Sequence, residues 1–205
     1  VAYTRALGGV EARTIDLSAI EKNDFFCPDV IAAVAMEEKI QQARAAGDTL
    51  GGIVEIIVRG CPPGLGEPVF DRMDADLAKA LMSVGTVKGV EIGAGFAAAR
   101  MTGSQCNDPI GPGGFVSNHA GGVLAGITTG AHIVARVACK PIPSIEAEQY
   151  TVDIHGRPTV VSVGGRHDRS VIPRIIPVVE AMTAITIADH LLRQKALSLS
   201  ADNRL

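Results

Sequence analysis

The chain has 205 residues, enough for one well-buried domain, and its 47% apolar content excludes an intrinsically disordered protein. The formal net charge of −3 offers no basic surface for nucleic acid. Aromatic residues make up only 3% of the chain, too few for a platform on which single-stranded bases stack.

The sequence also indicates whether the chain enters a membrane, is secreted or contains disulfides. Apolar stretches are broken by glycine or charge before the roughly 18 residues that a membrane span needs, so we expect no transmembrane helix. Val1–Arg5 shows no apolar region of a signal peptide. No Cys-x-x-Cys spacing links Cys27, Cys61, Cys106 and Cys139. We therefore expect free thiols packed as small apolar groups in a reducing cytosol, and no metal site.

The first half of the chain predicts two helices and two strands. A loop and turn over Leu17–Asp29 precede a helix over Val30–Ala46, which Gly47 stops. The β-branched run Ile53–Val58 predicts a strand, and Cys61–Gly66 a turn.

The clearest helix follows this turn. Its apolar face recurs at 3- and 4-residue spacing, over Phe70, Met73, Leu77, Ala80, Leu81 and Val84. Val87–Ile92 then predicts a short strand that Gly93 closes.

The glycine-rich residues 102–130 allow two interpretations, a flexible linker or an ordered loop whose backbone amides face a ligand. We favour the ordered loop, because apolar side chains recur regularly through it, at Ile110, Phe115, Val123, Leu124 and Ile127.

The second half predicts a strand, a hairpin and a helix. Ile133, Ala135, Val137 and Cys139 alternate on one face of a half-buried strand. Thr151–Ile154 and Thr159–Val163 form a hairpin around His155 and Gly156.

Pro177 is placed at the first position of a helix that runs to about Leu197. Along this helix an apolar row follows, at Val178, Met182, Ile185, Ala188 and Leu192. Because strands and helices do not alternate as βαβ units, the fold class is α+β, in one domain over residues 1–205.

Three segments have the composition of a binding site, and each has a plainer interpretation. Lys140–Ser144 is a proline-stiffened loop with an anion-facing lysine, or simply a solvated strand end. In Gly164–Asp168, two glycines precede an arginine, a histidine and an aspartate that could bind a phosphate or carboxylate group. The plainer interpretation is a surface turn with a local ion pair. Gly103–Pro109 and Ser117–Gly122 are dense in amides and hydroxyls, as a cofactor pocket is, but so are many loops. We expect His132, His155 and His190 to be non-catalytic.

Together these segments resemble the chorismate synthase family from about Phe25 to Leu192. The residues that carry the resemblance are Phe25–Asp29, Gly64–Asp76, Val87–Gly93, Gly103–Gln105, Ser117–Gly122, Lys140–Pro141, Gly165–Asp168 and Asp189–Arg193. The resemblance implies a β-α-β sandwich of antiparallel sheets around long helices, incomplete at the N-terminus.

The resemblance also implies an activity. Family members convert 5-enolpyruvylshikimate 3-phosphate to chorismate by a 1,4-elimination of phosphate and a proton that requires reduced FMN. The expected protein is a cytoplasmic homotetramer of the shikimate pathway, associated with NADP and acting on a small molecule, with no nucleic-acid or membrane partner.

By position, the resemblance assigns Asp168 the role of the acid near the flavin ring. The cofactor-contacting positions that it implies are Gly85, Thr86, Ala125, Lys140, Pro141, Ile142, Pro143, Ser144 and Arg166. Asn118 and His119 receive only a supporting role. Gly85-Thr86 and Ile142-Pro143 depart from the usual family residues, which points to backbone contacts there, and Arg169 adds a cation beside the site.

The family's Gly-Glu-Ser-His-Gly segment, its arginine-rich stretch and its Arg-Ser-Ser-Ala-Arg segment are absent from these residues. We therefore expect no turnover by them alone, because those segments supply the catalytic histidines and much of the phosphate-binding charge. Two alternatives remain, a scaffold that serves flavin binding or subunit association, and a generic phosphate-binding module that rests on glycine content alone.

Overall fold

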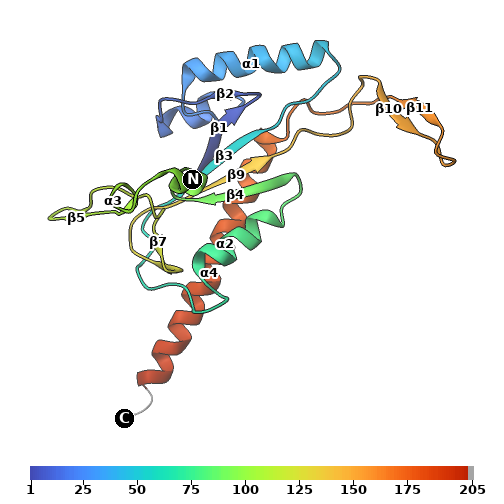
Figure 1. The fold of residues 1–205 in the computed structure, drawn as a ribbon. Helices are drawn as coiled ribbons and strands as arrows, with labels where there is room; N and C mark the ends of the chain where they lie inside the picture. Colours follow the sequence, from blue (N-terminus) through green and yellow to red (C-terminus); the bar gives the residue numbers. More distant parts are fainter. Residues whose placement is uncertain (203–205) are drawn as a thin grey trace. The chain divides into compact units, whose positions relative to one another are not determined.

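The structure, a computed structural model, describes residues 1–202, with side chains described through Leu197. Many short strands are interspersed with helices, and a long helix is the last element that the structure describes (Figure 1). In chain order the elements are β1 (Ala2–Leu7), β2 (Val10–Glu11), the 3₁₀-helix η1 (Leu17–Lys22), α1 (Val30–Ala45), β3 (Gly52–Val58), α2 (Met73–Met82), β4 (Val87–Ile92), the 3₁₀-helix η2 (Gly95–Arg100), α3 (Gly103–Cys106), β5 (Ile110–Gly111), β6 (Gly114–Phe115), β7 (Val123–Leu124), β8 (Ile127–Thr128), β9 (Ile133–Cys139), β10 (Gln149–Val152), β11 (Pro158–Val161) and α4 (Ile172–Asp202).

The strands form one five-stranded sheet, in the order β2-β1-β3-β9-β4, and three antiparallel two-stranded ribbons, β5-β6, β7-β8 and β10-β11. At the sheet edge β1 and β2 run antiparallel, with Ala6 opposite Glu11 and Leu7 opposite Val10. The fold is thus mixed α+β with antiparallel sheets, as predicted. The chain's contacts divide it into two compact units.

Unit 1 comprises residues 1–2, 55–137 and 177–205. Its core holds Cys61, Leu65, Met73, Leu77, Val123 and Ile133, with Val58, Ile92, Ile187 and Leu191 packed against it. Helix α2 packs against β4, and it buries Met73, Leu77 and Leu81, which are spaced four residues apart. Phe70, predicted to begin this apolar face, precedes the helix and is 88% exposed, so that part of the prediction is wrong.

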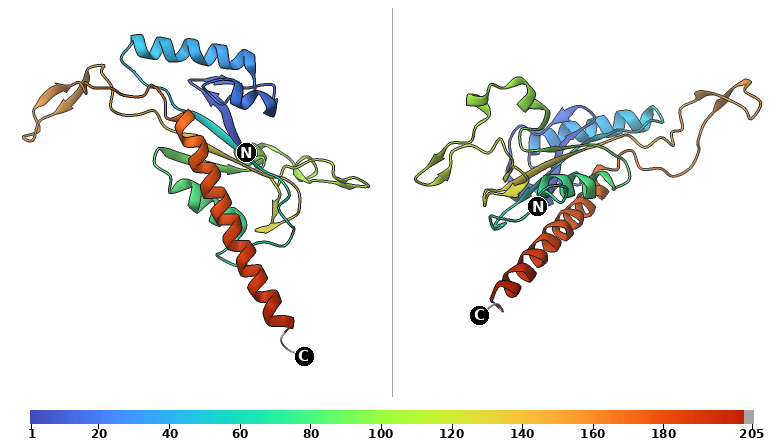
Figure 2. Two further views of the ribbon diagram at one scale, coloured as in Figure 1. Left: turned by 180° about the vertical axis from the view of Figure 1, so that it is seen from behind. Right: turned by 60° about the horizontal axis from the view of Figure 1, so that its bottom comes forward.

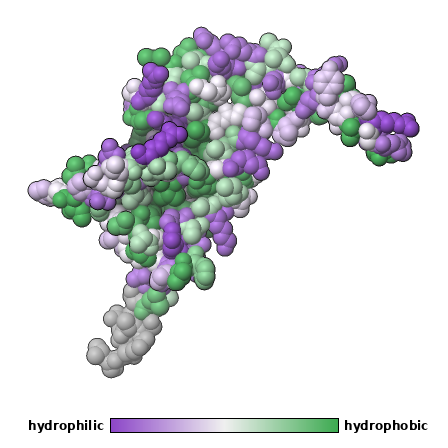
Figure 3. Space-filling model, viewed as in Figure 1, coloured by the Kyte–Doolittle hydropathy of each residue, from purple (hydrophilic) through white to green (hydrophobic). Residues whose placement is uncertain are grey.

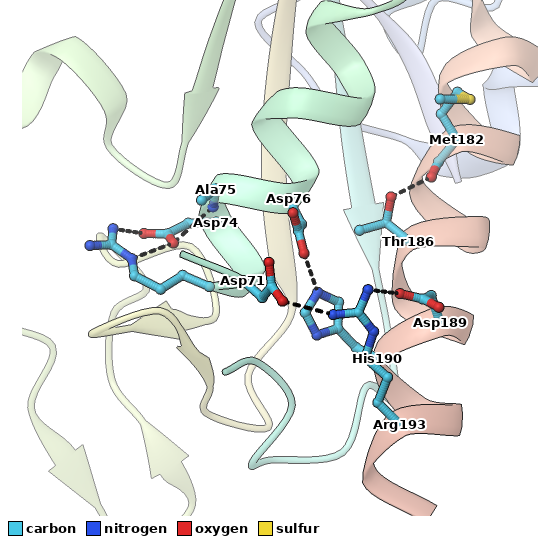
Figure 4. A network of polar contacts seen from close by, with 10 residues as sticks. Asp71, Asp74, Ala75, Asp76, Met182, Thr186, Asp189, His190 and Arg193 are labelled. Atoms are coloured by element: carbon cyan, nitrogen blue, oxygen red, sulfur yellow. Dashed lines mark hydrogen bonds and ion pairs between the residues drawn. The ribbon is translucent and has the colours of Figure 1, made fainter. Parts of the chain in front are cut away.

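A polar network joins α2 to α4 within unit 1 (Figure 4). His190 on α4 is buried, and its Nε2 lies 3.0 Å from Asp76 Oδ2 on α2. Outside this pair, the Arg193 guanidinium bonds Asp71 at 3.1 Å and Asp189 at 2.7 Å. The two carboxylates raise the pKa of Arg193, Asp189 having the larger effect.

Helix α4 begins at Ile172, five residues before the predicted start at Pro177, and Pro177 lies inside it. The prediction is wrong for a local reason. An interior proline loses the hydrogen bond to the carbonyl four residues earlier, here that of Pro173, and its ring crowds that carbonyl, at a cost of about 3 kcal/mol or more. Burial of Ile172 and Ile176, in the part of the helix before Pro177, offsets this cost.

The apolar row predicted along α4 is not its buried face. Val178, Ile185 and Leu192 are 44%, 63% and 65% exposed, whereas Val179 and His190 are buried. By length and composition Ile172–Leu197 could also cross a membrane, contrary to our expectation that no segment could. This is a weak indication, since core helices of soluble proteins share these properties.

Unit 2 comprises residues 3–54 and 138–176. Asp29 caps the start of its helix α1, where the Asp29 carboxylate accepts hydrogen bonds from the amides of Ile31 and Ala32. The same carboxylate accepts the amides of Arg13 and Thr14. Bonds from Thr14, Ala32 and Arg13 lower the pKa of Asp29 to about 2.

The β10-β11 hairpin projects from unit 2 at the end of two extended segments (Figures 1 and 2). Nearly all of its strand residues are exposed, including Tyr150 at 95%. The space-filling view shows apolar and polar surface mixed along it (Figure 3). The predicted hairpin is confirmed with shifted bounds, and α1, β3, β4 and β9 lie where the sequence predicts them, to within about one residue.

Candidate functional site

A cavity of about 520 Å³ lies within unit 2. Three segments line it: the loop before α1, the outward face of α1, and the turn that leads into α4. Its lining residues are Asp24, Phe25, Glu37, Ile40, Arg44, Gly165, Arg166, His167, Asp168, Arg169, Ser170, Pro173 and Arg174. The volume falls within the range of about 300–1,000 Å³ that is typical of small-molecule sites.

Two residues predicted from the sequence, Arg166 and Asp168, line this cavity together. Arg174 in the first turn of α4 binds the Asp168 carboxylate at 3.0 Å. The sequence left two interpretations of this turn, a surface turn with an ion pair and a ligand-binding turn. The structure contains both an ion pair and a cavity here. Arg166 is exposed and forms no hydrogen bond or ion pair with any residue that the structure describes.

Two further nitrogen atoms of the same turn lack partners. His167 Nε2 and Arg169 Nη1 are buried, and neither has a hydrogen-bond partner among the described residues. Native proteins seldom leave such groups unsatisfied, and exceptions call for an explanation such as a bound ion or ligand. Arg169 uses its other terminal nitrogen, Nη2, to bind Glu146 at 2.9 Å.

The loop Lys140–Ser144 follows β9 directly and lies against the segment 47–50. Thr49 Oγ1 donates to the Ile142 carbonyl at 2.6 Å, and the Gly47 carbonyl accepts the Glu146 amide at 2.9 Å. The turn with Arg166 lies against the same segment, because the Leu50 amide donates to the Arg169 carbonyl at 2.7 Å.

No residue of 140–144 lines the cavity described above. Lys140, Pro141 and Pro143 are exposed, and Ile142 and Ser144 are partly buried. A cleft shared by Lys140 with Arg166 and Asp168 therefore stays a prediction.

The other predicted contacts, Gly85, Thr86 and Ala125, belong to unit 1. Gly85 and Thr86 form the turn between α2 and β4, and Ala125 lies in the turn of the β7-β8 ribbon. Thr86 (φ +77°) and Ala125 (φ +52°) adopt left-handed backbone conformations that cost a side-chain-bearing residue free energy. In addition, Thr86 Oγ1 is buried without a partner among the described residues.

The glycine-rich residues 102–130 are ordered, as predicted, and Asp108 organises them. Its carboxylate accepts the Ser117 hydroxyl at 2.6 Å and the amides of His119 and Ala120 at 2.7 and 2.8 Å. Burial opposes ionisation of this acid, but these bonds together lower its pKa. The amides of His119 and Ala120 thus serve the loop itself.

Sequence reasoning missed the contributions of α1 and the loop before it. Asp24, Phe25, Glu37 and Arg44 lie more than a hundred residues before the turn that they face across the cavity. No local pattern marks Glu37 and Arg44, because an exposed charge on a helix is usually a solvated one. Phe25 lies in a segment that carries the family resemblance, but nothing in the sequence assigned it to this site.

The sequence and the fold of this chain are both similar to those of known proteins. A chorismate synthase family model matches residues 1–192. Chorismate synthase of Syntrophus aciditrophicus (strain SB) is 62% identical over 203 residues, covering 97% of this chain and 57% of the relative. That of Desulfosudis oleivorans is 59% identical over 197 residues, covering 96% of this chain and 56% of the relative.

A solved structure described as the crystal structure of chorismate synthase superposes with a TM-score of 0.76 at 31% sequence identity. The superposition covers 94% of this chain and 56% of the solved one. The chain thus spans a little over half the length of the relatives that it matches.

Proposed function

Because the chain belongs to the chorismate synthase family, we propose that the protein containing it is a carbon–oxygen lyase that forms chorismate. Its substrate is 5-enolpyruvylshikimate 3-phosphate, which loses phosphate and a proton in a 1,4-elimination that serves aromatic amino acid biosynthesis. One observation carries the proposal: the partnerless Arg166 and the ion-paired Asp168 line the same cavity of ligand size.

The chemistry of elimination explains why arginines suit this cavity. As the C–O bond breaks, negative charge accumulates on the departing phosphate, and fixed cations stabilise that charge without reorganising. A guanidinium can form two parallel hydrogen bonds to phosphate oxygens. The guanidinium groups of Arg166 and Arg44 are both available to bind a phosphate. That of Arg166 has no partner among the described residues, and that of Arg44 makes no ion pair with them and donates only to Gln41, at 3.1 Å.

The proposal includes reduced FMN as cofactor, and the described residues fit it on several counts. Thr86 carries a buried hydroxyl without a partner, and Thr86 and Ala125 hold strained backbone conformations of the kind that collects at ligand sites. When bound, the reduced flavin supplies electron density to the substrate as phosphate departs.

Within this proposal the chain's own residues bind and orient. Lys140–Ser144, with Arg166, would hold the anionic tail of the cofactor, and Gly85, Thr86 and Ala125 would contact it mainly through backbone. Asp168, which Arg174 contacts at 3.0 Å, would accept a hydrogen bond from the flavin ring and so orient it. The proposal also takes the protein to be a cytoplasmic homotetramer associated with NADP, which the resemblance alone supports.

Fluorescence titration with FMN tests the flavin contact. Arg166→Ala should weaken FMN binding at least about tenfold, the cost of one charge-assisted hydrogen bond. Arg157→Ala removes the same charge from the exposed hairpin of unit 2 and should leave affinity within about twofold. Identical curves for Arg166→Ala and the unsubstituted chain would count against the assignment.

The activity itself is tested on the natural gene product. Chorismate formation from 5-enolpyruvylshikimate 3-phosphate, followed by absorbance under anaerobic conditions with reduced FMN, is expected. Its absence in a folded protein that binds FMN would contradict the proposed reaction while leaving the flavin contact intact.

A further inference from the structure

Arg136 on β9 joins three strands of the sheet. Strand β9 lies between β3 and β4, and the Arg136 guanidinium contacts a carboxylate on each neighbour. Nη1 lies 3.3 Å from Glu55 Oε2 on β3, and Nε lies 3.1 Å from Glu91 Oε2 on β4. The side chains of Arg136, Glu55 and Glu91 are 26%, 12% and 29% exposed. Because the odd-numbered residues of β9 are the buried ones, this ion cluster lies on the opposite face of the sheet.

The third nitrogen of the same guanidinium reaches beyond the strands. Nη2 donates to the carbonyl of Gly93, the first residue after β4. Glu91 uses its second oxygen, Oε1, to accept the Phe96 amide at 2.9 Å. The ion cluster therefore holds the turn over residues 93–96 at both ends, in addition to the backbone bond from the Gly93 amide to the Val134 carbonyl at 2.9 Å.

This turn supports the glycine-rich loop 117–122. The Ala94 amide donates to the His119 carbonyl at 2.7 Å. The contact is so close that a Cβ added to Gly93 would stand 2.1 Å from the oxygen of the same carbonyl. Backbone lies directly against backbone, so a displacement of the turn must displace the loop.

The loop leads directly into the β7-β8 ribbon, whose turn holds Ala125. The Thr129 amide, just after β8, donates to the Gly122 carbonyl at 2.9 Å, so the end of the loop is tied to the ribbon. Ala125 has a left-handed backbone conformation (φ +52°), and the proposed function places a backbone contact with the flavin there. A conformation of this kind persists only where the surrounding structure over-determines it.

The geometry of the cluster favours a role in positioning over one in stability. A partly buried ion pair adds little net stability, because desolvation offsets the attraction between its charges. A guanidinium, in contrast, presents its donors in one rigid plane. Two acceptors of Arg136 belong to the sheet and the third belongs to the turn, so the plane fixes the turn relative to the sheet.

We propose that Arg136 is a positioning residue for the cofactor site. By holding the Gly93 carbonyl it fixes the turn 93–96, and through that turn the loop 117–122 and the backbone at Ala125. The inference rests on the proposed function only for the identity of the ligand, the flavin, and the hold on the loop stands without it.

Amide hydrogen exchange of the 205-residue chain, followed by NMR, tests the hold on the loop. Arg136→Met keeps much of the side-chain volume and removes every donor. The Ala94 amide should then exchange at least about tenfold faster, as expected for the loss of one charge-assisted hydrogen bond. The matched control is Lys88→Met on β4, which changes the net charge equally at an exposed lysine without a partner among the described residues. The control should leave the exchange rate within about twofold.

A triple variant separates positioning from stability. Arg136→Met alone leaves Glu55 and Glu91 without their cation, and the resulting loss of stability also speeds exchange. Adding Glu55→Gln and Glu91→Gln removes both unpaired charges, so the urea midpoint should recover most of the loss. Fast exchange at Ala94 should persist, because the Gly93 carbonyl still lacks its donor. If exchange returned to the original rate together with the midpoint, Arg136 would act through stability alone and the proposal would be overturned.

Fluorescence titration with FMN tests the consequence for the site. The dissociation constant should rise at least about threefold in Arg136→Met and in the triple variant, and Lys88→Met should change it by less than about twofold. Fast exchange at Ala94 with unchanged FMN affinity would overturn the positioning role. If the unsubstituted chain did not bind FMN while exchange still depended on Arg136, the proposed cofactor would be wrong and the hold on the loop would be supported.

Discussion

The buried His190 on α4 contacts the partly buried Asp76 on α2, with Nε2 and Oδ2 3.0 Å apart, although the residues stand 114 positions apart in the chain (Figure 4). The imidazole side chain is 1% exposed and the carboxylate 19%. Because a buried group without a partner keeps its full desolvation cost, removing either member penalises the one that remains. The pair therefore fixes α4 against α2 within unit 1.

Asp76→Ala should lower the free energy of unfolding by about 1–3 kcal/mol, because the buried imidazole loses its partner. Arg193→Ala, which breaks the exposed contacts to Asp71 and Asp189, should lower it by less than Asp76→Ala does, because solvent screens exposed ion pairs. Urea denaturation measures both values. Adding His190→Ala to Asp76→Ala should cost less than the sum of the single changes; strict additivity would show that the pair does not interact.

The carboxylate at the start of α1 predicts a pH dependence. The pKa of Asp29 is lowered to about 2 in the folded chain, against about 3.9 in an unfolded one. Its contribution to stability is therefore complete above about pH 4 and is lost as the pH falls through about 2. Asp29→Asn should flatten this acid limb of the stability profile.

Glu38→Gln is the matched control for this profile. Glu38 is an exposed acid on the same helix and bonds none of the described residues, so the substitution should leave the acid limb unchanged. Chemical denaturation between pH 2 and 5 gives the comparison. If Asp29→Asn and the unsubstituted chain lost stability in parallel on acidification, the assigned role of Asp29 would be wrong.

Gly93 closes β4 at a point where only glycine fits. Its φ is +58°, and an added Cβ would collide with the His119 carbonyl. Gly93→Ala should therefore cost about 2 kcal/mol or more, from backbone strain and steric overlap together. Gly113→Ala, in open space with nothing within 4 Å, should stay within about 0.5 kcal/mol. Similar unfolding midpoints for the two variants would contradict the steric argument.

Thr86 connects stability to the proposed cofactor contact. Its φ of +77° and its partnerless hydroxyl are both unfavourable in the free chain. Thr86→Gly should raise stability by about 1 kcal/mol, since relief of strain exceeds the entropic cost of glycine. FMN titration of the same variant should show slightly weaker binding, because the backbone contact of Thr86 remains while its partnerless hydroxyl is lost.

The control for Thr86 makes the same substitution where no strain exists. Thr159→Gly, in the exposed strand β11, should lower stability by about 0.5–1 kcal/mol. If Thr86→Gly lowered the free energy of unfolding as much as Thr159→Gly does, the positive φ of Thr86 would carry no free-energy cost.

The amino-acid sequence by itself determined the regular elements whose pattern is local. The alternation through His132–Cys139 predicted a strand, and β9 covers Ile133–Cys139 with its odd-numbered residues buried. Gly47 and Gly93 mark the ends of α1 and β4 because backbone turns there with positive φ. The resemblance to a family likewise depended on the order and spacing of short segments, which need no knowledge of packing.

Only the tertiary structure decided which surfaces find partners. Val178, Ile185 and Leu192 form an apolar row, yet they are exposed, because periodicity marks an apolar face without saying what covers it. The cavity joins Arg44 of α1 to His167 and Arg169 of a distant turn. The buried, unsatisfied nitrogens of that turn depend on how the backbone places those side chains, and no spacing in the sequence encodes that.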